Sequence, residues 1–252
     1  MHPTLQRLDD IATCLSARDD TIAVLGLGSA GAQRARLDDH SDLDFLLVVM
    51  DGAKWRYLDR YDWLEEQARV VYSFANERDG RCVLYADGIF AEYRVLTVAE
   101  LAHVPFSGAR LVWRRADAPQ GLAENHAPVP HTPYDSAGYH LNYALTCLYT
   151  GMHLELRGER LAAMREIQTG ALDSVIALAR LETGEAPYRD PFNPSRRVER
   201  TYPLPLAAMA PGYTGNADAA RAILEWLSKR YPVDPAIGSP IRELIRRSDD
   251  YR

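Results

Sequence analysis

The distance between two apolar segments near the start of the sequence restricts the fold more than any other feature. Residues 21–27 and 43–50 are short apolar runs rich in β-forming residues, and each run predicts a strand. The segment between them is short and mostly polar. A crossover helix packed along a parallel strand needs about a dozen residues with a continuous apolar face. We therefore do not expect such a helix here, although one or two helical turns fit near residues 30–36.

The same segment contains a glycine pattern that is typical of dinucleotide-binding proteins. Gly26, Gly28 and Gly31 have the GxGxxG spacing, and Asp51 follows 20 residues after Gly31, where a ribose-binding acid is expected. That fingerprint also requires a helix of about three turns after the third glycine. The sequence leaves no room for this helix, and Asp51 with the following glycine is more simply a turn. A nicotinamide-dependent oxidoreductase is thus the disfavoured alternative.

A second pattern in the segment points to different chemistry. Gly28 and Ser29 follow the first strand, and Asp42 and Asp44 begin the second. Side chains alternate along a strand, so the two carboxylates lie on one face about 7 Å apart. Their repulsion is costly unless a cation lies between them, and Mg²⁺ binds a few carboxylates together with substrate phosphates. A Gly-Ser turn lets the backbone and a hydroxyl group approach a phosphate.

The complete arrangement resembles that of a known superfamily. Gly-Ser, a dozen further residues, "SDLDF" and a later single acid in a strand are similar to the nucleotidyltransferases that include DNA polymerase β and antibiotic-modifying enzymes. This resemblance covers residues 20–98. "NERDGRCVLYADGIFAEYRVLTVAEL", "RGERLAAMREI" and "NPSRRVE" look most like the lincosamide and aminoglycoside nucleotidyltransferase group.

The resemblance implies an activity and its partners. A nucleoside monophosphate would pass from a nucleoside triphosphate, taken to be ATP, to a hydroxyl of a small molecule such as a lincosamide or aminoglycoside antibiotic, with release of pyrophosphate. Mg²⁺ would be the cofactor, held by Asp42 and Asp44. The resembling enzymes also imply a homodimer and a role in antibiotic resistance. The alternative within the superfamily is a catalytically silent relative that binds nucleotide or a protein partner, as an antitoxin does.

The third acid is expected in a strand next to the one that carries Asp42. In "IFAEYRVLT" this residue is Glu92, and the resemblance implies that it acts as general base on the acceptor hydroxyl. Asp87 is the rival, but the "ADG" turn gives it an ordinary structural reason to be there. Alternatively, Glu92 has a purely structural role at an exposed strand position, where it pairs with Arg94.

Four residues form the expected nucleotide-binding set. Gly28 and Ser29 would anchor the triphosphate, and Arg34 and Ser41 lie in the loop that leads to the second strand. Arginine is suited to phosphate oxygens, although an arginine in a loop is often simply solvated.

The remaining pattern divides the chain into two parts. We expect an α+β domain over residues 1–135, with a nucleotidyltransferase-type mixed sheet and flanking helices, and a helical bundle domain over 136–252. Residues 99–135 contain many chain breakers and predict an irregular linker. The other expected elements are a helix over 3–18, a helix over 53–69, strands over 70–75, 81–86 and 89–98, and helices over 136–156, 159–183, 217–230 and 238–247.

Composition excludes several classes of protein. The formal charge of -6 argues against binding of nucleic acid. Cys14, Cys82 and Cys147 are too widely spaced for a zinc site or a disulfide framework. The sequence predicts neither a signal peptide nor a membrane span, so a cytoplasmic protein without membrane contacts is expected.

Overall fold

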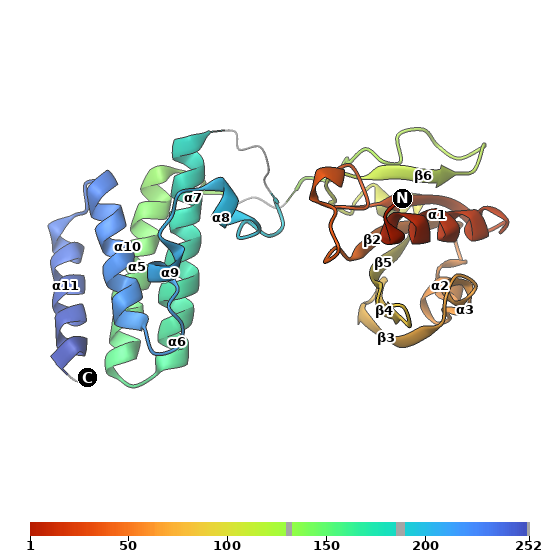
Figure 1. Cartoon of the computed structure of the whole chain (residues 1–252). Coiled ribbons are helices and arrows are strands. Elements are labelled where there is room, and N and C mark those ends of the chain that lie inside the picture. Colours follow the sequence, from red (N-terminus) through yellow and green to blue (C-terminus); the bar gives the residue numbers. More distant parts are fainter. Residues whose placement is uncertain (130–132, 185–189, 251–252) are drawn as a thin grey trace. The chain divides into compact units, whose positions relative to one another are not determined.

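The computed structural model describes the whole chain except residues 130–132, 185–189 and 251–252 (Figure 1). It divides into two compact units, Met1–Val129 and Pro130–Arg252. The sequence pattern placed the division six residues later, between residues 135 and 136. Each unit is described by itself.

The first unit is built on a six-stranded sheet with the order β3-β4-β5-β2-β1-β6. The β2–β5 pair is parallel and the other four pairs are antiparallel. The sheet is therefore mixed, and the α+β class expected from the sequence is confirmed. The strands are β1 (Thr21–Gly26), β2 (Leu43–Val49), β3 (Val70–Glu77), β4 (Gly80–Tyr85), β5 (Phe90–Thr97) and β6 (Arg110–Arg114).

The antiparallel pairing of β1 and β2 excludes the dinucleotide-binding unit. Gly26 pairs with Phe45, so the two strands run in opposite directions and need no crossover helix. Between them lies only a short 3-10 helix, Arg34–Arg36. Close packing explains why Gly26 and Gly31 of the GxGxxG pattern are glycines. A Cβ on Gly26 would lie 2.5 Å from the carbonyl oxygen of Ala30, and a Cβ on Gly31 would overlap the backbone.

One face of the sheet packs against three helices. These are α1 (Pro3–Ser16), α2 (Lys54–Leu58) and α3 (Asp62–Glu65). The centre of this core is aromatic: the rings of Phe45 and Tyr93 stack with centroids 5.2 Å apart, and Trp63 meets both rings edge-on. Large buried rings of this kind contribute strongly to a small core.

The opposite face is only partly covered. Leu46 and Leu96 pack there against Leu101 of α4 (Val98–Leu101) and against Phe106. Alternation along the strands places Asp44 on this face, two residues before Leu46, and Glu92, four residues before Leu96. Both acids thus lie beyond the apolar cover.

Two local expectations in this unit are wrong. The predicted helix over 53–69 is two short helices, α2 and α3, and the chain between them turns so that the indole nitrogen of Trp63 donates to the carbonyl oxygen of Arg60 at 3.0 Å. The predicted linker over 99–135 contains the end of α4 and the edge strand β6, which pairs with β1.

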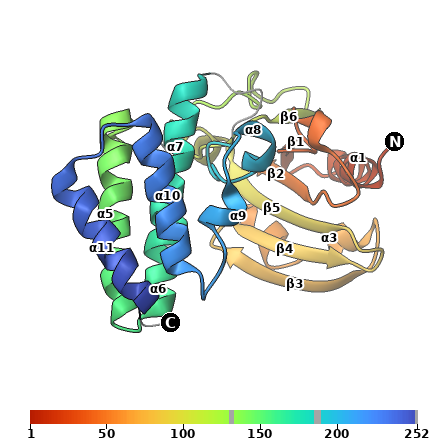
Figure 2. The ribbon, with the colours of Figure 1, turned by 60° about the vertical axis from the view of Figure 1, so that its left-hand side comes forward.

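The second unit is helical throughout its described residues. Its core contains Leu148 and Met152 of the long helix α5 (Ala137–Leu156) together with apolar residues of the other helices. Figures 1 and 2 show α5, α7, α10 and α11 side by side. The predicted helix over 159–183 is interrupted by a π-helix, Arg165–Ala171. The helices are α5 (Ala137–Leu156), α6 (Arg160–Met164), α7 (Leu172–Thr183), α8 (Val198–Thr201), α9 (Leu206–Met209), α10 (Asn216–Arg230) and α11 (Pro235–Asp250). Among the described helices, none has both the length and the apolar content that crossing a membrane would require.

Candidate functional site

The turn after β1 brings backbone close to a carboxylate of β2. Gly28 has φ of +52°, in the left-handed region that favours glycine, and a Cβ at this position would lie 3.6 Å from Oδ2 of Asp44. The N–H of Leu27 donates to the carbonyl oxygen of Asp44 at 2.8 Å, which fixes the turn to the start of β2. The next residue, Ser29, is buried. The Gly-Ser turn and Asp44 therefore form one local structure.

Asp44 and Glu92 face each other across the parallel strand pair. They are register partners on β2 and β5, and such partners project to the same face of a sheet. Asp42 lies two residues before Asp44, at the entry to β2, and both aspartates are half-buried. Asp44 and Glu92 thus lie opposite each other on the less covered part of this sheet face, and Asp42 directly precedes β2.

Two neighbours of Glu92 were missed by the sequence analysis. Asn76 donates from Nδ2 to Oε1 of Glu92 at 2.6 Å, and Cys82 of β4 is the register partner of Glu92. Burial raises the pKa of the Cys82 thiol, and the negative charges of Glu92, Asp44 and Glu77 raise it further.

Arg94 does not pair with Glu92, as a purely structural role for Glu92 would require. Its guanidinium forms a two-pronged ion pair with Glu77 of β3, with Nη2 at 2.5 Å from Oε2. The exposed carboxylate of Glu92 is held by the amide of Asn76 instead. An amide is a neutral donor, so it orients the carboxylate without forming an ion pair with it.

A pair of arginines lies beside the Gly-Ser turn. Arg34 is in the 3-10 helix, and Arg110 of β6 donates from Nε to the carbonyl oxygen of Ala30 at 3.2 Å. Burial lowers the pKa of Arg110, and the positive charge of Arg34 lowers it further, whereas Asp9 of α1, whose Oδ1 lies 3.7 Å from Nη2 of Arg110, raises it. Paired arginines next to a tight turn are suited to phosphate oxygens. Arg110 escaped the sequence analysis because residues 99–135 showed no strand pattern.

Ser41 has a local structural task. Its hydroxyl accepts from the N–H of Asp38 at 3.0 Å and lies 3.2 Å from Oδ1 of Asp38. The N–H of Ser41 in turn donates to the carbonyl oxygen of Asp38. These bonds close the turn that delivers the chain to Asp42.

Asp87, the rival third acid, is held in an ion pair away from this cluster. Its Oδ2 lies 2.6 Å from Nη2 of Arg7 on α1, and the backbone N–H of Ile89 donates to Oδ1 at 3.3 Å. Partial burial disfavours ionisation, but these hydrogen bonds and the charge of Arg7 outweigh it and keep the pKa of Asp87 below its ordinary value. The structure gives Asp87 a role in joining α1 to the β4–β5 turn.

The donor set is suited to a hard cation. Asp42 and Asp44 supply carboxylate oxygens, which Mg²⁺ prefers, and this ion takes its other ligands from water and substrate phosphates. Nowhere in the described residues do three Asp, Glu, His or Cys side chains gather closely enough to hold a metal by themselves. Two carboxylates fit an ion that arrives with a nucleotide, so no dedicated protein cage is required.

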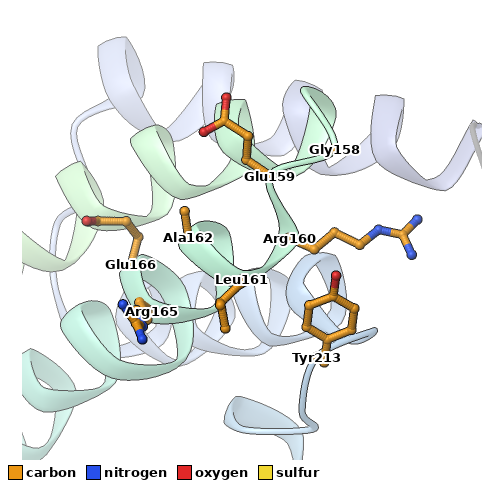
Figure 3. A pocket seen from close by; sticks show the side chains of 8 residues that line it. All are labelled: Gly158, Glu159, Arg160, Leu161, Ala162, Arg165, Glu166 and Tyr213. Atoms are coloured by element: carbon orange, nitrogen blue, oxygen red, sulfur yellow. The ribbon is translucent and has the colours of Figure 1, made fainter.

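The "RGERLAAMREI" segment surrounds a surface hollow of about 510 Å³ in the second unit, at the start of α6 (Figure 3). Figure 3 shows that the charged ends of Arg160 and Arg165 point in different directions and do not converge. Nε of Arg160 lies 3.7 Å from Oε1 of Glu155, whose side chain is only 8% exposed, so this arginine is already engaged in an ion pair. This hollow has no convergent set of polar groups.

The comparisons with known proteins find likeness only among solved structures. No family model matches the chain, and no curated protein matches it. A nucleotidyltransferase-like protein from Exiguobacterium sibiricum is similar with 13% identity and a TM-score of 0.33, over 96% of this chain and 80% of that one. An aminoglycoside 6-adenyltransferase from Bacillus subtilis has 11% identity and a TM-score of 0.31, over 99% of each chain.

A third solved structure is the CD-NTase CdnG of Bradyrhizobium diazoefficiens in complex with GTP, with 13% identity and a TM-score of 0.26 over 99% of each chain. At this degree of likeness, the activity of the chain has to be argued from its own residues.

Proposed function

We propose that this chain is a Mg²⁺-dependent nucleotidyltransferase that moves a nucleoside monophosphate from ATP to a hydroxyl group of a small molecule. The observation that carries the proposal is the register pairing of Asp44 with Glu92, next to a Gly-Ser turn whose backbone lies against Asp44. A phosphate-binding turn, a carboxylate pair for a cation and a further acid are the parts that this reaction needs. The resemblance of the motifs to nucleotidyltransferases supports the same assignment.

Each part has a distinct task in the proposed reaction. Gly28 and Ser29 bind the triphosphate through backbone N–H groups and the hydroxyl, and Arg34 with Arg110 neutralises phosphate charge. Asp42 and Asp44 would hold Mg²⁺, which neutralises the charge that develops on the phosphates. Glu92, oriented by Asn76, accepts the proton of the acceptor hydroxyl. The acceptor oxygen forms a bond to the α-phosphorus, the bond from that phosphorus to the bridging oxygen breaks, and pyrophosphate leaves.

The experiment that tests this proposal is an ATP titration with and without Mg²⁺, followed by pyrophosphate release with lincosamide and aminoglycoside acceptors. Binding should require Mg²⁺ and should be lost in the double variant Asp42→Asn with Asp44→Asn. Asp51→Asn is the matched control, because Asp51 is an exposed acid in the turn after β2. Binding that is independent of Mg²⁺, or that depends on Asp51 instead, would contradict the proposal. Metal-dependent binding without turnover would favour the catalytically silent alternative.

A further inference from the structure

Three exposed aromatic side chains lie on the sheet face that carries the acids. Tyr72 and Phe74 of β3 are 55% and 44% exposed, and Phe90 of β5 is 37% exposed. Most large apolar side chains of the strands are buried in the two cores, so these rings need another explanation. The rings of Tyr72 and Phe74 are neighbours, with centroids 5.8 Å apart.

Strand register connects these rings to the acids. Phe74 pairs with Cys82, Cys82 pairs with Glu92, and Glu92 pairs with Asp44, which makes one row across β3, β4, β5 and β2. Figure 2 shows β3, β4 and β5 side by side, as this register requires. Strands are about 4.8 Å apart, so the row is roughly 14 Å long. Register partners share a face, so Phe74 lies on the face of the acids.

A second row completes the apolar surface. Tyr72 pairs with Leu84, and Leu84 pairs with Phe90. We call Tyr72, Phe74, Leu84 and Phe90 the aromatic platform. It is contiguous with Glu92, which lies two residues after Phe90 on β5.

The order of the strands assigns the platform to one of the two substrates. The Gly-Ser turn lies on the β1 side of Asp44, whereas Tyr72, Phe74 and Leu84 of the platform lie on the β3 side of Glu92 and Phe90 lies on the same strand as Glu92. A triphosphate bound at the turn reaches the carboxylates from one side. The molecule whose hydroxyl faces Glu92 must come from the other side, over the platform.

On these grounds, and resting on the proposed function, we propose that the acceptor is a hydroxylated molecule with a flat apolar ring or ring face that packs on Tyr72, Phe74 and Phe90. Aromatic rings bind such faces by stacking and area burial, and the exposed carboxylate of Glu92 meets the polar end. An aminosugar that is polar on every side gains little from this surface. The platform thus selects for an amphipathic acceptor.

The test measures the binding of two probes, phenyl β-glucoside and methyl β-glucoside, by ligand-observed NMR on the full chain. The probes differ only in the group attached to the sugar, which is a phenyl ring in one and a methyl group in the other. The native protein should bind the phenyl compound more tightly. Phe74→Ala and Tyr72→Ala should each weaken that binding about three- to tenfold, as the loss of an aromatic contact does. ATP binding with Mg²⁺ should stay unchanged. Trp55→Ala is the matched control, because Trp55 is 50% exposed on α2, away from this face.

Several results would overturn the proposal. Equal affinity for the two glucosides, or no effect of Phe74→Ala and Tyr72→Ala, would show that the platform binds no ring. If Phe74→Ala and Tyr72→Ala also weakened ATP binding, the platform would bind the nucleotide base instead of the acceptor. A change of mass in light scattering would show that it is an interface between copies of the chain. The NMR experiment measures binding and does not require turnover, so its result is independent of the test of the proposed function. The proposed function would be contradicted if Mg²⁺-ATP binding did not depend on Asp42 and Asp44.

Discussion

Asp44 and Glu92 lie directly opposite each other on the parallel pair β2–β5, at the part of the sheet that the apolar cover leaves open. The two acids have different surroundings. Asp44 lies against the backbone of Gly28, and Glu92 receives a hydrogen bond from Asn76. In the proposed reaction, Asp44 acts near the phosphates and Glu92 acts near the acceptor.

Substitution of Asp44 by Asn should reduce pyrophosphate release by at least about a hundredfold, because loss of a metal-binding charge removes several kcal/mol of transition-state stabilisation. The folded state should be retained, since repulsion between the acids is relieved. Rates and thermal unfolding of the native protein, Asp44→Asn and the control Asp51→Asn check this. Full activity in Asp44→Asn would show that the carboxylate is not needed.

Gly28→Ala should cost about 1 kcal/mol of the free energy of unfolding, because an L-residue is strained at φ of +52°. The new Cβ also lies near Oδ2 of Asp44, so binding of Mg²⁺-ATP should weaken. Gly52→Ala is the control: its φ is +82° and its Cβ meets nothing within 4 Å. Denaturant unfolding and ATP titration should show that Gly52→Ala loses stability alone. If both variants bind ATP equally well, the Gly28 turn is not the phosphate site.

Asn76→Ala should lower kcat several-fold and leave the affinity for ATP unchanged, because the amide only orients Glu92, the proposed general base. Asn76 is a positioning residue, and Asn76→Gln, which keeps a donor, should restore part of the rate. Steady-state kinetics with varied ATP and varied acceptor separates the two effects. A change confined to the KM for ATP would assign Asn76 to the nucleotide instead.

Cys82 should report on the charge of the acids. Burial and the carboxylates of Glu92, Asp44 and Glu77 raise its pKa, so little thiolate is present near pH 8. Asp44→Asn removes one negative charge, lowers the pKa of Cys82 and should speed its alkylation by a few-fold. Peptide-resolved mass spectrometry after iodoacetamide treatment measures this rate. An unchanged rate in Asp44→Asn, with folding intact, would place Asp44 farther from the thiol than the structure has it.

Asp87→Asn should leave activity unchanged and cost only about 0.5 kcal/mol of stability near neutral pH, because the Arg7–Asp87 ion pair is half-exposed at the aspartate. The pKa of Asp87 is lowered in the folded state. Its stabilising effect is therefore complete above the ordinary value of 3.8 and is lost as the pH falls further. Unfolding curves of the native protein and Asp87→Asn should converge in that acid range. A large loss of activity would make Asp87 the third acid after all.

The sequence predicted the strands that carry the site because each is a short apolar run with distinct boundaries. It could not predict β6, because residues 110–114 lie between two groups of chain breakers and their pairing with β1 is a long-range contact. For the same reason Arg110 was missed. The break between α2 and α3 depends on tertiary packing of Trp63, which overrides local helical periodicity.

Asn76 and the aromatic platform illustrate a different limit. The motif indicated which acids to expect, but the partners of Glu92 depend on the register of β3 against β4 and of β4 against β5. The sequence pattern predicts a strand that ends at residue 75, whereas β3 continues to Glu77, and the side chain of Asn76 reaches Glu92. Register is fixed by the whole sheet, and a single sequence shows little of it.

The most direct test of the proposed chemistry follows a radioactive label from ATP to the acceptor in the presence of Mg²⁺. Label in the α-phosphate should appear in the acceptor product of the native protein, and label in the γ-phosphate should appear in pyrophosphate. Neither transfer should occur in the double variant Asp42→Asn with Asp44→Asn. Transfer of the γ-label to the acceptor, or α-label transfer that survives in the double variant, would contradict nucleotidyl transfer at Asp42, Asp44 and Glu92.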